Sequence, residues 1–90
     1  LHPTSQFKKD FKRIQLFPEK VEAFRYIADM LIQNASIPKE FKPHMLSGDY
    51  KGCMECHVEN DLLLIWIDGD IINLVRIGSH SELFGKKKKR

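Results

Sequence analysis

Apolar residues in the last third of the chain form short runs that are broken by polar turn residues. Leucine, isoleucine, valine and tryptophan dominate residues 52–84, and the polar segments 59–61 and 68–69 divide this stretch into three parts. Runs of this kind between turn signals predict three consecutive antiparallel strands. Asp68-Gly69 is a two-residue hairpin signal, since a type I′ turn needs positive φ at both central positions, so residues 65–67 are expected to pair with residues 71–73.

Alternation within the first of these strands separates polar from apolar side chains. Glu55 and His57 share one face, because side chains two apart on a strand point the same way, while Met54, Cys56 and Val58 face the other side. The sheet is therefore expected to have one apolar face and one polar face.

Further charged residues lie near the ends of the predicted strands. Asp61 lies at the first turn, Arg76 late in the third strand and His80 just beyond it, where a side chain can lean over the sheet edge. With Glu55 and His57 they bring two imidazoles, two carboxylates and one guanidinium toward a single face.

The first half of the chain has helical periodicity instead. Phe7, Phe11 and Ile14 recur at helical spacing after Ser5, which can cap the helix, and Pro18 suits the first turn of a second helix. The basic residues of the first helix are Lys8, Lys9, Lys12 and Arg13. The apolar stripe of the second helix comprises Val21, Phe24, Ala28 and Leu31, widened by Ile27 and Ile32.

The remaining segments complete an α+β order of elements. Pro3 limits residues 1–4 to an edge strand, and the two prolines and the glycine within residues 37–48 predict an irregular crossing that carries His44 toward the sheet. The order is β-α-α-β-β-β. We therefore expect two N-terminal helices packed on one face of an antiparallel-rich, four-stranded sheet, with the other face open to a ligand.

Length and charge indicate one domain over residues 1–85 followed by a basic tail over residues 86–90. The chain has 90 residues, 42% of them hydrophobic, and a net charge of +3 that owes five positive charges to the tail. The longest apolar run, residues 62–67, is far shorter than the ~18 residues that cross a bilayer. Two cysteines give no disulfide framework. A cytoplasmic protein with no membrane association is expected.

The run Cys53-Met54-Glu55-Cys56-His57 matches the C-x-x-C-H pattern of c-type haem attachment. We reject haem, because positions i and i+3 of a strand face opposite sides and the two thiols would diverge. A zinc site that adds His44 fails for the same reason unless a bulge intervenes, and a redox C-x-x-C lacks its usual strand-then-helix context. No metal and no cofactor is expected, and Cys56 is expected in the core.

Three histidines beside a guanidinium and two carboxylates suit metal-free RNA cleavage. The 2′-hydroxyl attacks its own phosphodiester while a base removes its proton, an acid protonates the departing 5′-oxygen and a cation stabilises the phosphorane. Imidazole suits the proton steps, and guanidinium matches phosphate oxygens. The candidate residues are His44, His57, His80, Arg76, Asp61 and Glu55. A plain binding surface is the alternative interpretation of the same residues. Phe84 is a better base-stacking candidate than Trp66, which lies in an apolar run.

Four segments resemble the RelE superfamily of bacterial toxin–antitoxin ribonucleases, and within it the YafQ branch. They are FKKDFKR at residues 7–13, IPKEFKPHMLSG at 37–48, MECHVENDLLLIW at 54–66 and LVRIGSHSELF at 74–84. The resemblance covers nearly the whole chain. It implies the microbial RNase fold and an mRNA interferase that cuts codons in the ribosomal A site. It also implies silencing by a cognate antitoxin of the RelB/DinJ type, with operator DNA bound only through that antitoxin.

The resemblance also assigns roles to residues of this chain. Its catalytic positions are His44, His57, Asp61, Arg76 and His80, and its substrate-binding positions are Phe84, Glu55, Lys8, Lys9, Lys12 and Arg13. His80 is implied as general acid and either Asp61 or a neighbouring histidine as base. The resemblance implies that Arg76, His44 and His57 contact the phosphate and that Phe84 contacts the base. It also implies that the basic first helix contacts the ribosome.

Two positions depart from this family pattern. Members often carry Arg where Met54 stands and Trp where Leu62 stands, so weaker phosphate and base contacts are expected here. This favours keeping a second hypothesis, a non-catalytic RNA- or ribosome-binding inhibitor of translation.

Overall fold

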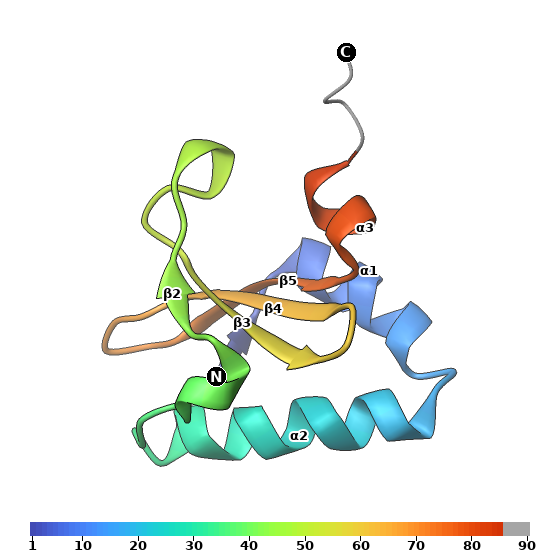
Figure 1. Cartoon of the computed structure of the whole chain (residues 1–90), viewed down its shortest axis with the longest axis horizontal. Helices are drawn as coiled ribbons and strands as arrows, with labels where there is room; N and C mark the ends of the chain where they lie inside the picture. Colours follow the sequence, from blue (N-terminus) through green and yellow to red (C-terminus); the bar gives the residue numbers. More distant parts are fainter. Residues whose placement is uncertain (86–90) are drawn as a thin grey trace.

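A five-stranded sheet lies at the centre of the computed structural model, which describes residues 1–85 (Figure 1). The strands are β1 (His2–Pro3), β2 (His44–Met45), β3 (Met54–Glu59), β4 (Leu62–Ile67) and β5 (Asn73–Gly78), in the spatial order β1-β5-β4-β3-β2. The helices are α1 (Ser5–Ile14), α2 (Pro18–Ile32) and α3 (His80–Phe84), with short 3₁₀ turns η1 (Lys39–Phe41) and η2 (Gly48–Tyr50). The predicted α+β class is confirmed. The predicted basic tail, residues 86–90, lies outside the described residues.

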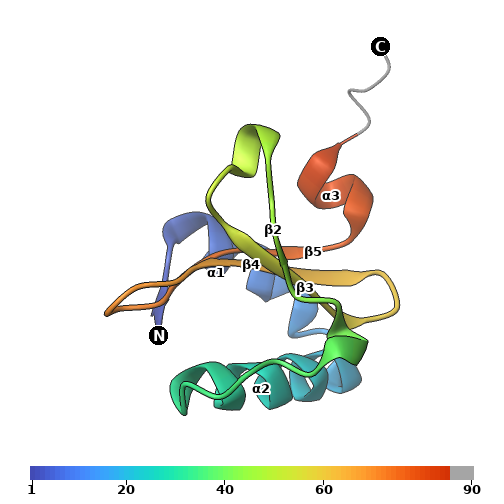
Figure 2. The same cartoon turned by 60° about the vertical axis from the view of Figure 1, so that its left-hand side comes forward.

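The two long N-terminal helices and α3 lie on opposite sides of the sheet. Figures 1 and 2 both show α2 beneath the sheet, and α3 above it together with the segment that carries η2. Helices α1 and α2 share one hydrophobic core with the lower face, as the sequence predicts. None of the helices within residues 1–85 combines the length and the apolarity that crossing a bilayer requires.

The three long antiparallel strands are confirmed, but the predicted two-residue hairpin is wrong. Ile67 pairs with Asn73, so residues 68–72 form a longer loop, and neither Asp68 nor Gly69 has a positive φ. The carboxylate of Asp68 accepts a hydrogen bond from the Trp66 indole N–H (2.9 Å). Asp68 therefore has a partner at the end of β4, two residues earlier in the chain.

Two edge strands flank the long ones. Strand β1 pairs in parallel with β5, where the N–H groups of His2 and Thr4 donate to the carbonyls of Ile72, just before β5, and Leu74, while Pro3 needs no partner at the edge. Strand β2 was missed in the predicted four-stranded sheet, because residues 37–48 were expected to be irregular. Its two residues pair with β3, His44 opposite Glu55, and are too few to produce a periodic pattern.

Side-chain caps set where the helices begin. Helix α1 is capped by Thr4, whose hydroxyl accepts from the Phe7 N–H (3.2 Å), and not by Ser5 as predicted. Helix α3 was not predicted. It begins at a capping box in which Ser79 and Glu82 each accept from the other's backbone N–H, at 3.2 and 2.8 Å.

The sheet has a hydrophobic core on each face. The lower core contains Phe7, Ile14, Ile27, Leu31, Cys56, Val58, Leu62, Leu64, Trp66, Leu74 and Ile77. A smaller upper core contains Cys53, Leu63, Ile65 and Leu83. The upper face is therefore not open along its whole length, because α3 covers part of it with Leu83. The expectations that Cys56 and Trp66 are core residues are confirmed.

One charged side chain lies within the apolar stripe of α1. Asp10 is 1% exposed, and its carboxylate accepts from Nε and Nη2 of Arg76 (2.7 and 3.2 Å) and from the Ile77 N–H (3.1 Å). Arg13 adds a fourth donor at 3.3 Å. A carboxylate this deeply buried is stable only because it is paired and hydrogen-bonded, so Asp10 ties α1 to β5.

We predict that Asp10→Ala lowers the free energy of unfolding by roughly 3–5 kcal/mol, because it leaves the guanidinium of Arg76 unpaired. Urea denaturation followed by circular dichroism measures the effect. Asp29→Ala, an exposed aspartate on α2, is the control and should change stability by no more than about 0.5 kcal/mol. An Asp10→Ala variant as stable as that control would contradict the role given to Asp10.

Candidate active site

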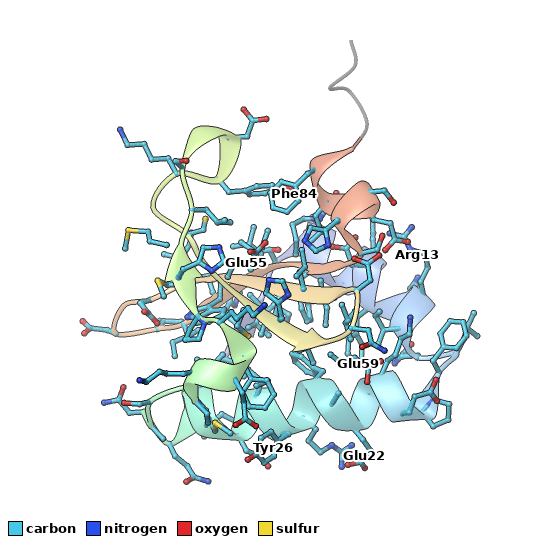
Figure 3. All side chains as sticks on the ribbon, viewed as in Figure 1. Arg13, Glu22, Tyr26, Glu55, Glu59 and Phe84 are labelled. Atoms are coloured by element: carbon cyan, nitrogen blue, oxygen red, sulfur yellow. The ribbon has the colours of Figure 1, made fainter. Side chains whose placement is uncertain are left out.

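Strand pairing places four of the predicted residues on the upper face of the sheet. His44 lies opposite Glu55, Glu55 opposite Ile65, and Ile65 opposite Arg76, which makes one row across β2, β3, β4 and β5. Directly paired residues point to the same side of a sheet. His57 lies two residues from Glu55, so it shares that side. Figure 3 shows Glu55 on the side of the sheet that faces Phe84.

His80 and Asp61 form a pair at the end of this face. Oδ1 of Asp61 accepts from the backbone N–H of His80 (3.0 Å) and contacts its Nδ1 (2.7 Å). Because Asp61 accepts at Nδ1, the neutral ring carries its proton on that atom and leaves Nε2 free. The backbone and side-chain hydrogen bonds from His80 lower the pKa of Asp61.

Two aromatic rings lie next to the His80 ring. The His57 ring lies 5.7 Å from it, and the Phe84 ring, one turn further along α3, lies 6.4 Å from it. Phe84 is 37% exposed and packs edge-on against Tyr50 at 5.6 Å. Two imidazoles and an exposed aromatic ring therefore lie together.

His44 and Glu55 form a second imidazole–carboxylate pair. Nε2 of His44 lies 3.1 Å from Oε1 of Glu55, and Nδ1 lies 2.8 Å from the Lys42 carbonyl. With Glu55 ionised, both contacts are hydrogen bonds only when both ring nitrogens carry protons. Glu55 is 4% exposed, and its other oxygen, Oε2, has no hydrogen-bond partner within residues 1–85.

Arg76 lies on the predicted face, but other side chains bind its guanidinium. Besides the two bonds to Asp10, Nη1 donates to the Tyr50 hydroxyl (3.1 Å). The hydrogen bond to Asp10 raises the pKa of Arg76, against the effect of burial. Within residues 1–85 three of the five guanidinium N–H groups have a partner, and the other two can donate to an anionic ligand.

The basic residues of α1 do not converge on the histidines. Lys8, Lys9, Lys12 and Arg13 are all exposed. Lys8 and Lys12 border an apolar groove between α1, α2 and β1, whereas Arg13 reaches toward α3, with its Nε 3.8 Å from Glu82. These side chains form a basic surface on α1 that is separate from the cluster of histidines.

The two thiols lie on opposite faces, as the strand argument predicts. Cys56 belongs to the lower core and Cys53 to the upper one, and burial raises the pKa of both, that of Cys56 to about 12. Within residues 1–85 no three histidine, cysteine, aspartate or glutamate side chains are placed to hold a metal ion together.

Two residues of this region were missed from the sequence. Asp10 could have been found, because an acidic residue inside the stripe of Phe7, Phe11 and Ile14 predicts a buried partner. Tyr50 carries no such signal, because it lies in a 3₁₀ turn with no periodic pattern.

Comparison with known proteins identifies relatives of this chain over nearly its whole length. A family model described as a bacterial toxin of type II toxin–antitoxin systems, YafQ, matches residues 1–85. The mRNA interferase toxin YafQ of Escherichia coli K12 is 33% identical over 84 residues, which cover 91% of each chain. A crystal structure of the E. coli DinJ–YafQ complex superposes with a TM-score of 0.84 at 34% identity, over 93% of this chain and 96% of that one. A metal-bound toxin from Helicobacter pylori superposes with a TM-score of 0.81 at 31% identity, over 92% and 96%.

The contact between Asp61 and His80 predicts a measurable titration. The carboxyl carbon of Asp61, followed by NMR, should titrate below the ordinary value of 3.8. In His80→Ala the pKa should return only part of the way, because the backbone N–H of residue 80 can still donate. Since the folded pKa is the lower one, the pair stabilises the fold above the ordinary value, and this stabilisation is lost as the pH falls through the folded pKa. Asp49, which is exposed, serves as the control. An Asp61 pKa that does not respond to His80→Ala would exclude this contact in solution.

Proposed function

Because this chain belongs to the YafQ family of toxins of bacterial type II toxin–antitoxin systems, we propose that it is a metal-independent endoribonuclease that cleaves mRNA in the ribosomal A site. The observation that carries this proposal is the His80–Asp61 pair beside His57, on the face that also holds the His44–Glu55 pair and Arg76. Such a surface supplies an oriented acid, a neighbouring base and cationic groups for one phosphodiester.

His80 is suited to act as the general acid. When its Nδ1 donates to Asp61, the opposite nitrogen, Nε2, is free to face the scissile bond and to carry the proton that is transferred. The carboxylate of Asp61 holds the ring in place. His80 then protonates the 5′-oxygen as the bond from phosphorus to that oxygen breaks.

His57 is better suited than Asp61 to act as the general base. The lowered pKa of Asp61 makes it a weak proton acceptor, and its Oδ1 is occupied by two contacts to His80. His57 is half-buried, and its ring centre lies 5.7 Å from that of His80. In the proposed reaction His57 takes the proton of the 2′-hydroxyl, whose oxygen then bonds to phosphorus. The products are a 2′,3′-cyclic phosphate and a 5′-hydroxyl.

Arg76 and His44 are the groups proposed to face the phosphate oxygens. The two N–H groups of Arg76 without a partner within residues 1–85 can donate to a non-bridging oxygen, and His44, whose ring nitrogens face Glu55 and the Lys42 carbonyl, lies in the same row of the sheet near the proposed phosphate. The contact with Glu55 holds the His44 ring in its orientation. Phe84, exposed on α3 beside His80, is suited to stack on the base next to the scissile phosphate.

The two departures from the family pattern lie away from this face. Leu62 is 2% exposed in the lower core, and Met54 packs against that core as well. Neither side chain borders His57 or Glu55 on the upper face. They therefore give little support to a loss of activity through phosphate or base contacts.

The biological setting follows from the relatives. A DinJ antitoxin binds YafQ in E. coli, so this toxin is proposed to have a cognate RelB/DinJ-type antitoxin, to reach operator DNA only through it, and to act in the cytoplasm. The exposed Lys8, Lys9 and Lys12, with Arg13, are proposed to contact ribosomal RNA.

One observation favours the second candidate, a non-catalytic inhibitor of translation. Asp10 offsets the charge of Arg76, which weakens the stabilisation that Arg76 could give to a phosphorane. Such an inhibitor would block translation without producing new RNA ends.

We predict that His80→Ala lowers the rate of mRNA cleavage on programmed ribosomes by about 10²–10⁴-fold, the range typical of a lost proton-transfer group. Primer extension on a translated message maps the new 5′ ends. His2→Ala, which removes an exposed imidazole on β1, is the matched control and should cleave like the wild type.

Two further measurements separate the ribonuclease from the non-catalytic inhibitor. A 2′-deoxy substitution at the cleaved nucleotide should abolish cutting, and EDTA at a concentration that leaves the ribosomes intact should not. Translation arrest without new 5′ ends would favour the non-catalytic inhibitor. Undiminished cleavage by His80→Ala would remove the assigned acid.

A further inference from the structure

The hydroxyl of Tyr50 connects two parts of the candidate site. It donates to the backbone carbonyl of Leu83 in α3 (3.0 Å) and accepts from Nη1 of Arg76 in β5 (3.1 Å). One phenol thus bridges the guanidinium proposed to bind phosphate and the helix that carries His80 and Phe84. No role was assigned to Tyr50 on sequence grounds.

The bond to Leu83 holds the end of a short helix. Helix α3 has five residues, and the last carbonyls of a helix have no partner within it. The Leu83 carbonyl takes the Tyr50 hydroxyl instead. The side chain of Leu83 is 5% exposed in the upper core, so the hydroxyl bond and this burial together keep α3 against the sheet.

The bond to Arg76 completes the set of contacts that orient the guanidinium. Asp10 holds Nε and Nη2, and Tyr50 holds Nη1, so each nitrogen has one partner. A planar guanidinium with all three nitrogens bound has a single orientation. Its two remaining N–H groups then have fixed directions.

The ring of Tyr50 supports Phe84. The two rings pack edge to face, with centres 5.6 Å apart and planes at 89°. Phe84 is exposed and lies at the end of α3, where little else restrains it within the described residues. The phenol and the ring of Tyr50 therefore act on different neighbours, and a change that removes only the hydroxyl separates the two effects.

We propose that Tyr50 is a positioning residue for RNA cleavage, which orients Arg76 toward the phosphate and fixes α3 so that His80 and Phe84 meet the same nucleotide. This inference rests on the proposed function. Tyr50 itself transfers no proton. Its effect appears in the step at which the phosphate is attacked, because it fixes groups that act on the transition state.

The test is Tyr50→Phe, which keeps the ring against Phe84 and removes the hydroxyl. Loss of one bridging hydrogen-bond donor and acceptor is expected to lower kcat roughly tenfold with little change in KM, measured as mRNA cleavage on programmed ribosomes. Tyr26→Phe is the matched control, because Tyr26 is 56% exposed on α2 and packs on Phe41 away from the site. It should leave kcat and KM unchanged.

A double-mutant cycle shows whether Tyr50 acts through Arg76. We expect Tyr50→Phe and Arg76→Lys together to lower kcat by less than the product of the two single effects, because both changes disrupt the same contact. A merely structural Tyr50 would lower the melting temperature and would give independent effects on kcat. Rates are compared at a temperature where circular dichroism shows every variant folded.

The outcomes separate this inference from the proposed function. If the wild type cleaves and Tyr50→Phe cleaves equally fast, or if its effect multiplies with that of Arg76→Lys, the role of Tyr50 is overturned and the ribonuclease stands. If the wild type produces no new 5′ ends, the proposed function fails and the role of Tyr50 fails with it.

Discussion

The ion pair between Asp10 and Arg76 is the interaction on which the rest of the structure depends. It joins the first helix to the last strand across 66 residues of sequence, with both oxygens of a buried carboxylate engaged by the guanidinium. The same carboxylate accepts the backbone N–H of Ile77, so it also fixes the end of β5 from which α3 departs. A buried pair of this kind is tolerated only with complete geometry, which makes the position of β5 relative to α1 unusually well defined.

The fixed position of β5 also positions the groups on the upper face. Helix α3 begins two residues after β5, and its capping box together with the contact of Asp61 sets the place of His80. Its last turn is held by Leu83 in the upper core. A five-residue helix has little stability of its own, so its geometry comes from these contacts and not from its helix propensity.

Each cationic group of the site has a carboxylate beside it. His80 faces Asp61, His44 faces Glu55 and Arg76 faces Asp10. Pairing lets three basic groups share one small face without strong mutual repulsion, and each pair also orients its cation. Because each of these basic groups is paired with a carboxylate, the three pairs together carry little net positive charge. The exposed lysines of α1 lie outside this cluster of pairs, so the positive charge of the molecule and the candidate site are separate.

The sequence by itself determined the class of the fold, the three long strands, the two long helices and the face that Glu55 and His57 share. All of these follow from the burial of one side of a regular element, which local periodicity records. Family motifs added the candidate site residues, whose roles stay a prediction. The capping box of Ser79 and Glu82 was also present in the sequence, and it could have predicted α3. Only the tertiary structure decided the register of the β4–β5 loop, the strand at His44, the carboxylate partner of each cation and the bridge made by Tyr50. These depend on contacts between residues far apart in the chain, such as Tyr50 with Leu83, and no local pattern encodes which distant group will satisfy a buried donor or acceptor.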